Sequence, residues 1–249
     1  MGAGLHLPGG SPVHRLPPQC KLLAVLAFAL VVVATPREWF WAFGLYAVML
    51  AAVSAVARIP PGHLLRGLVI ELPFVLFALL VPVIGMGERT EVLGLSLSVP
   101  GLWAAWNILA KATLGVTASL LLASTTAPRE VLAGAQRLRA PDLLVQIAMF
   151  MLRYLDVIVG EMRRMRVARE SRGFLARDLR QVPVVARSAG ALFIRSYERG
   201  ERVHLAMLSR GYTGRMPVID DARATARQWG TALALPLAAL GVLLWGLTA

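Results

Sequence analysis

The sequence predicts an all-α, polytopic membrane protein with about five to six transmembrane helices and two long cytoplasmic helices. Of the 249 residues, 57% are hydrophobic, and a mean hydropathy of +0.64 is too apolar for a soluble domain of this length. Apolar runs long enough to cross a bilayer alternate with short polar breaks. Residues 129–227 hold 19 of the 26 basic residues, and arginine kept beside membrane spans is typical of the cytoplasmic side.

The N-terminal half supplies most of the predicted spans. Residues 1–21 are expected to be a cytoplasmic tail, mobile or lying on the surface, and 22–126 to hold the N-terminal transmembrane helices. The run Leu22–Thr35 covers only about 21 Å at ~1.5 Å per residue. Its helix is therefore expected to tilt little, to extend back through Cys20, or to let Lys21 snorkel to the interface. Further spans are expected at Trp39–Ala57, Gly67–Gly85 and Gly101–Ser124, with 87–98 as an external loop.

Residues 127–227 form the predicted cytoplasmic region, and a last transmembrane helix follows within 228–249. The first long helix of this region covers 142–172, where apolar residues three or four apart form one stripe. Asp142 is a start signal, and Gly173 is a stop signal. The region therefore begins with an amphipathic helix of about eight turns.

The second long helix is predicted over Pro183–Arg210, with Gly211 as its stop. Glu198 and Arg202 lie four residues apart with the acid first, the favourable order for an ion pair within a helix. The sequence leaves open whether the first halves of the two long helices enter the bilayer.

One short motif closes both helices. Residues 168–174 and 206–212 both read A-x-x-S-R-G-aromatic. In each copy the glycine can adopt a left-handed turn, alanine and serine are small enough for another surface to approach, and arginine is a rigid fork for carboxylates or carbonyls. One Arg-Gly helix end is ordinary C-capping, but two matching copies favour a binding role. The residues predicted to form this contact are Ala168, Ser171, Arg172, Gly173, Ala206, Ser209, Arg210 and Gly211.

Two ionisable residues lie inside apolar spans, where charge is costly unless it is paired or wetted. Glu71 is in the third span, close to Pro73, which is expected to kink the helix, and Lys111 is in the fourth. They could form a coupling or proton-relay site. The alternative, which we favour, is a structural pair or groups that snorkel to the interface.

Motifs of known chemistry are absent from the sequence. It has no Walker A loop, no G-x-G-x-x-G and no H-E-x-x-H. One cysteine, Cys20, and four scattered histidines predict neither a disulfide nor a metal site, and no cofactor is expected. Nucleic-acid binding is disfavoured because the basic segment is interleaved with a helical apolar stripe. We therefore expect a non-catalytic chain whose energy source is another protein.

The paired motif resembles the coupling motifs of the transmembrane T component of energy-coupling factor (ECF) transporters, in particular the cobalt-type CbiQ. The resemblance covers most of the chain. The two copies of the motif differ at their second and third positions, where the first has Arg169 and Glu170 and the second has Met207 and Leu208. Similar stretches are Pro18–Lys21, Leu122–Thr126, Leu138–Pro141, Met151–Leu155 and Leu192–Arg199.

This resemblance implies a scaffold subunit in a prokaryotic cell membrane. In the family, the two motif-bearing helices dock into grooves on a pair of cytoplasmic ABC-type ATPases, and the T component cradles a small substrate-binding membrane subunit. Arg172 and Arg210 would be the central ATPase contacts, and the metal would be bound by the substrate subunit. Cobalt rests on family likeness alone, so nickel or a vitamin stays open. The alternatives from other classes are a stand-alone secondary transporter using Glu71 and Lys111, and an intramembrane enzyme.

Overall fold

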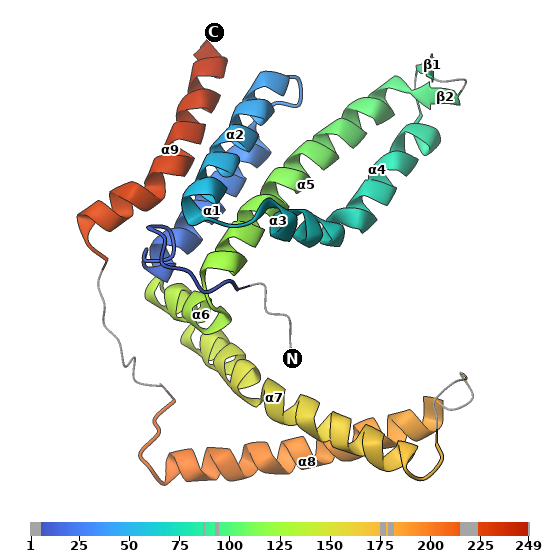
Figure 1. Cartoon of the computed structure of the whole chain (residues 1–249), viewed down its shortest axis with the longest axis vertical. Helices are drawn as coiled ribbons and strands as arrows, with labels where there is room; N and C mark the ends of the chain where they lie inside the picture. Colours follow the sequence, from blue (N-terminus) through green and yellow to red (C-terminus); the bar gives the residue numbers. More distant parts are fainter. Residues whose placement is uncertain are drawn as a thin grey trace. The chain divides into compact units, whose positions relative to one another are not determined.

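The structure, a computed structural model, describes residues 6–86, 88–92, 95–174, 178, 182–214 and 224–248. The chain divides into two compact units, one of Met1–Leu138 with Ala222–Ala249 and the other of Arg139–Asp221. Within the described residues, the regular structure is helical except for one two-stranded hairpin (Figure 1). The predicted all-α class is confirmed.

The first unit contains the N-terminal helices and the C-terminal helix (Figure 1). The second unit contains two long helices, α7 (Asp142–Glu170) and α8 (Val182–Leu208). The elements of the first unit are α1 (Pro18–Ala34), α2 (Phe40–Ala57), α3 (Pro61–Gly67), the 3₁₀ turn η1 (Leu68–Glu71), α4 (Leu72–Ile84), β1 (Arg89–Val92), β2 (Leu95–Ser98), α5 (Val99–Thr125), α6 (Pro128–Arg137) and α9 (Ala226–Thr248).

Among the described residues, five segments are long and apolar enough to cross a membrane. They are α2, Pro61–Ile84, α5, α7 and α9. The chain is thus a multi-pass membrane protein, as predicted. The set differs in one member from the expected one, because α7 is included while α1, with 17 residues, is shorter than the others.

The core of the first unit lies between α1, α2, α5 and α9. Phe28 and Tyr46 are fully buried and meet edge to face, with ring centroids 5.9 Å apart. The Tyr46 hydroxyl donates a hydrogen bond to the Ala239 carbonyl at 3.3 Å, so α2 is tied to α9. Buried Leu114 and Ala118 bring α5 into the same cluster. A buried hydroxyl with a partner is what an apolar core requires.

The third span is broken, whereas the sequence predicts one kinked helix over Gly67–Gly85. It consists of α3, the 3₁₀ turn η1 and α4, and Pro73 is the second residue of α4. Proline has no N–H to donate, and its ring clashes with the preceding turn. The tighter 3₁₀ turn just before it fits that constraint.

The N-terminal segment, residues 6–17, is packed against the helices. Its Leu7 N–H donates to the Ser124 carbonyl at 2.9 Å, at the end of α5. Helix α1 begins at Pro18 rather than at Leu22, and Lys21 is 6% exposed. The described part of the predicted surface tail is therefore folded, and Lys21 does not snorkel. The sequence could not predict this packing, because it joins residues more than a hundred positions apart.

Two predicted connections contain regular structure. The loop predicted over 87–98 includes an antiparallel hairpin in which Arg89 lies opposite Ser98. The basic connector includes helix α6, whose Gly134 lies so close to the start of α1 that a Cβ there would be 2.9 Å from backbone atoms. Arg137 of α6 also donates to the Gln19 side chain at 2.9 Å. This helix therefore belongs to the first unit.

Candidate functional site

The first copy of the paired motif ends α7 in a Schellman turn, a helix ending with two reversed hydrogen bonds. Phe174 N–H donates to the Arg169 carbonyl at 3.0 Å, and Gly173 N–H to the Glu170 carbonyl at 3.0 Å. Gly173 has a φ of 77°. This left-handed value is disfavoured for residues with a Cβ, so the turn needs glycine at this position.

The second copy ends α8 in the same way. Tyr212 N–H donates to the Met207 carbonyl and Gly211 N–H to the Leu208 carbonyl, both at 3.0 Å. Gly211 has a φ of 82°. The predicted glycine stops are thus confirmed at both helix ends. The aromatic residue of the motif occupies the position after the glycine, where a Schellman turn commonly makes an apolar contact.

The serine and the alanine of each copy are joined by a hydrogen bond. Ser171 Oγ donates to the Ala168 carbonyl at 3.1 Å, and Ser209 Oγ donates to the Ala206 carbonyl at 3.0 Å. Each serine hydroxyl therefore satisfies a carbonyl of the last helical turn. The equal spacing in the sequence produces equal local geometry in the two copies.

Both motif arginines are exposed. Within the described residues, neither Arg172 nor Arg210 has a hydrogen-bond or ion-pair partner. By contrast, Arg166, two residues before the first copy, pairs at 2.7 Å with Glu170 inside that copy. A free guanidinium offers five N–H donors in a planar fork. All eight predicted site residues are exposed: Ala168, Ser171, Arg172, Gly173, Ala206, Ser209, Arg210 and Gly211.

The second copy has an additional anchor, which we call the Gln146 clasp. The Tyr212 hydroxyl donates to Gln146 Oε1 at 2.6 Å, and Gln146 Nε2 donates to the Gly214 carbonyl at 3.2 Å. Gln146 is on α7 and is only 6% exposed. The first copy has Phe174 in place of the tyrosine and so has no hydroxyl for such a bond. Sequence reasoning did not find Gln146.

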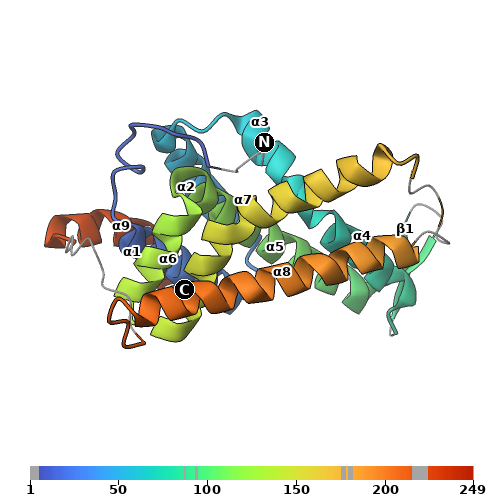
Figure 2. The same cartoon turned by 90° about the horizontal axis from the view of Figure 1, so that it is seen from below.

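Helices α7 and α8 run in opposite directions (Figures 1 and 2). The clasp joins the start of α7 to the residues after α8, and an ion pair between Glu161 and Arg199 joins the two helices further along. The two motifs therefore lie at opposite ends of the pair. The stretch from Gln146 on α7 to Arg172, two residues beyond its end, spans about 40 Å at ~1.5 Å per residue.

One predicted ion pair is wrong. Glu198 and Arg202 do not pair in the part of the chain that the structure describes. The neighbouring Arg199 instead reaches across to Glu161. A bond between two helices cannot be predicted from spacing within one of them, and here it replaces the local pair.

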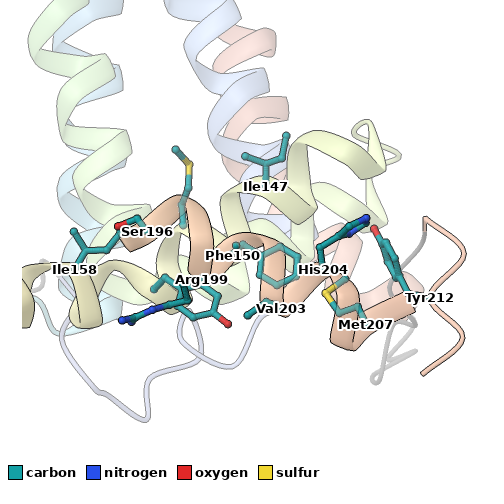
Figure 3. Close-up of a pocket in the computed structure, with 12 residues that line it drawn as sticks. Ile147, Phe150, Ile158, Ser196, Arg199, Val203, His204, Met207 and Tyr212 are labelled. Carbon is teal, nitrogen blue, oxygen red and sulfur yellow. The ribbon is translucent and has the colours of Figure 1, made fainter. Parts of the chain in front are cut away.

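A pocket of about 460 Å³ lies between α7 and α8, close to the second motif (Figure 3). Figure 3 shows His204 and Tyr212 at one end and Ile158 and Arg199 at the other. Much of the predicted apolar stripe of α7 remains uncovered, with Met151 69% exposed. The other residues that line the pocket are Ile147, Phe150, Met151, Tyr154, Ser196, Gly200, Val203 and Met207.

Glu71 and Lys111 have separate partners. Glu71 is 4% exposed and accepts a hydrogen bond from Thr113 Oγ1 at 2.7 Å. Lys111 Nζ donates to the Val33 carbonyl at 2.7 Å. Each polar group is thus satisfied by a neighbouring helix, as structural polar groups in apolar helices require. They do not form the structural pair with each other that the sequence suggested.

Metal ligands are not clustered in the described ranges. There, no group of three or more His, Cys, Asp or Glu side chains is arranged to hold an ion.

Comparison with known proteins matches residues 9–219 to the family described as CbiQ, Cobalt transport protein. The chain is similar to the Putative fused cobalt transport protein CbiMQ of Methanocorpusculum labreanum, with 25% identity over 85% of this chain and 36% of that protein. Uncharacterized protein MJ1089 of Methanocaldococcus jannaschii is 34% identical over 43% of this chain and 40% of its own length. This chain therefore spans less than half of these two relatives.

A third relative matches over most of both chains. The Energy-coupling factor transporter transmembrane protein EcfT of Listeria innocua is 27% identical over 85% of this chain and 84% of its own length. The family match includes both motif copies and the N-terminal helices. The chain belongs to the CbiQ family of cobalt transport proteins.

Proposed function

We propose that this chain is the non-catalytic coupling subunit of an ATP-driven ECF-type importer. In this role it carries the movements of a pair of cytoplasmic ABC-type ATPases to a small substrate-binding membrane subunit. ATP hydrolysis then belongs to the partner ATPases, and the region of α7 and α8 faces the cytoplasm. The concentration of arginine in this region supports that orientation.

The observation that carries the proposal is the pair of equivalent helix ends. Each has a Schellman turn, small exposed residues and, at the same position, an exposed arginine that has no partner among the described residues. Arg172 and Arg210 can therefore each enter a groove and donate to carboxylates or carbonyl groups there. The small residues of each copy leave room for the groove walls. They are Ala168, Ser171 and Gly173 in the first copy and Ala206, Ser209 and Gly211 in the second.

The placement of the two ends supports two separate docking partners. A single binding groove would need the ends close together, whereas about 40 Å of helix separates the levels of the two motifs along α7. Two copies of an ATPase, each taking one end, fit this spacing. The antiparallel pair would then change its crossing geometry when the two ATPases approach each other.

The uncovered apolar faces of α7 and α8 support contact with a membrane subunit. Phe193 and Leu205 of α8 are 71% and 64% exposed, and Leu155 of α7 is 53% exposed. Exposed apolar surface of this extent marks an interaction site or a membrane contact. We assign it to the substrate-binding subunit and the bilayer together.

Cobalt is the proposed substrate. The family that matches is described by cobalt transport, and a relative with that description in its name aligns over most of this chain. Nickel or a vitamin is the alternative within the same architecture. The EcfT relatives, whose names give no substrate, match over a similar extent and so do not favour cobalt.

The test replaces both motif arginines in the full transporter. Arg172→Ala with Arg210→Ala should reduce co-purification of the ATPases by at least about tenfold, because two charge-assisted contacts are lost. The matched control is Arg163→Ala with Arg202→Ala, which removes the same charge from exposed positions on the same two helices. Equal loss of the ATPases in both variants would show a nonspecific charge effect, and full retention in the first would refute the proposed contact.

Uptake is measured in the same cells with labelled cobalt, nickel and a vitamin in parallel. The first variant should abolish cobalt uptake while the protein stays in the membrane. If the unmodified transporter takes up nickel or a vitamin instead of cobalt, the proposed coupling role stands and the proposed substrate is wrong. Transport by the purified chain alone, driven by an ion gradient, would overturn the coupling role itself.

A further inference from the structure

A second pocket lies within the first unit. Its volume is about 390 Å³, within the ~300–1,000 Å³ range of ligand sites. Helices α1, α2, α5 and α9 and the N-terminal segment surround it. Its lining is almost entirely apolar and includes Phe28, Leu50, Leu121 and Leu235. Among the described residues that line it, Lys21 is the only one with a charged side chain.

The Lys21 side chain is buried, with only 6% of its surface exposed. It donates to two backbone carbonyls, that of Thr125 at 2.9 Å and that of His14 at 3.5 Å. Among the described residues, no carboxylate forms an ion pair with it. The Glu130 carboxylate attracts the Lys21 ammonium electrostatically from a longer distance. That carboxylate already accepts a hydrogen bond from Ala127 N–H at 3.1 Å at the start of α6. A buried charge that is only partly compensated is costly, and it favours an anion nearby.

The ammonium also has a donor to spare. Lysine has three N–H groups, and the two carbonyls occupy two of them. Lys21 lies in the first turn of α1, so its side chain lines the pocket at the end where the N-terminal segment also lines it. This end is level with the termini of the apolar helices, where lipid headgroups lie.

The pocket opens onto a surface that meets lipid. Ala52 and Val56 line it from α2 and are both exposed, Val56 by 53%. Helix α2 is one of the candidate membrane spans, so its exposed apolar face contacts acyl chains. An acyl chain can therefore enter the pocket sideways from the bilayer.

We infer that this pocket seats one anionic phospholipid, with an acyl chain among Phe28, Leu50 and Leu121 and a phosphate oxygen accepting a hydrogen bond from Lys21. Burial of the chain contributes favourable apolar contact, and the phosphate supplies the missing negative charge. The N-terminal segment then acts as a wall of a lipid site, which explains why its Pro12, Val13 and Leu16 face the pocket.

The test is native mass spectrometry of the purified full chain after exchange into detergent with added phosphatidylglycerol. The wild-type chain should retain one phosphatidylglycerol. Lys21→Met keeps most of the apolar stem but removes the charge, and it should weaken retention by about tenfold. Ala52→Phe fills the pocket from its exposed mouth while leaving Lys21 intact, and it should weaken retention to a similar extent.

The chain offers a matched control in its other lysine. Lys111→Met removes the same charge from a position on α5 that does not line the pocket, and it should retain the lipid. Inorganic phosphate is tested as a competitor, and phosphatidylcholine as a lipid without net charge.

Equal retention of phosphatidylglycerol by the wild type and by the Lys21 and Ala52 variants would overturn the site. Displacement of the lipid by millimolar phosphate, with Ala52→Phe unchanged, would also overturn it, because the site would then bind a free anion only. Loss from Ala52→Phe alone would assign an uncharged acyl ligand and overturn the role of Lys21. Circular dichroism on each variant confirms that the helices remain folded.

Discussion

The Gln146 clasp predicts that the two motif ends differ in stability. Tyr212→Phe removes the hydroxyl that donates to Gln146 Oε1 at 2.6 Å and leaves the ring in place. The change makes the second motif end in phenylalanine, as the first does at Phe174. We expect the second helix end to open more often, while the first end stays as it is.

The magnitude follows from the burial of Gln146. Loss of a neutral hydrogen bond costs about 0.5–1.5 kcal/mol, and a buried acceptor left without a donor raises the cost to about 1–3 kcal/mol. Gln146 is only 6% exposed, so water replaces the lost donor poorly. The local opening free energy should therefore fall by about 1–3 kcal/mol, and the affected amides should exchange about 5- to 150-fold faster.

Hydrogen–deuterium exchange of the purified chain measures this directly. Peptides that contain the amides of Gly211 and Tyr212 report on the second end, and peptides with Gly173 and Phe174 serve as the internal control. Unchanged exchange at the second end would refute the clasp. Equal acceleration at both ends would mean that the substitution acts on the whole chain rather than through Gln146.

Two further predictions concern packing and charge. Gly101→Ala should destabilise the chain by about 1–3 kcal/mol in a thermal unfolding assay, because the added Cβ would lie 2.8 Å from the Pro82 backbone. The control is Gly115→Ala on the same helix. Its Cβ would meet nothing within 4 Å, so this change should be neutral or stabilising. Arg199→Ala should cost about 1–2 kcal/mol, because it leaves the 14%-exposed Glu161 side chain without its ion partner. A double-mutant cycle with Glu161→Gln that gives no coupling energy would contradict this second prediction.

The sequence predicted the features that depend on neighbouring residues, namely where the long helices begin and end. Gly173 and Gly211 end their helices with positive φ because the left-handed turn depends only on residues within the turn. The long helices began at Asp142 and at Val182, at the predicted start and one residue before it, because cap signals and a helical apolar period act over a few residues. The exposure of the motif residues also follows from their polar, small character.

The sequence could not predict contacts between distant segments. The bond from Lys21 to the Thr125 carbonyl and the clasp between Gln146 and Tyr212 join residues that only the fold brings together. The same holds for the ion pair between Arg199 on α8 and Glu161 on α7, which joins two helices. Residue spacing within one helix cannot predict such contacts, because their interaction energies depend on burial and on the angle between helices.

The hydrogen bonds that shape each motif turn lie within eight consecutive residues, 167–174 in one copy and 205–212 in the other. Such a unit is portable. Grafted onto the C-terminus of an unrelated water-soluble helix, the first octapeptide should keep its shape without the membrane portion of the chain, and the second should keep its backbone turn but lose the Gln146 clasp. The graft would give a soluble ligand whose affinity for a candidate ATPase can be titrated in plain buffer, one motif at a time.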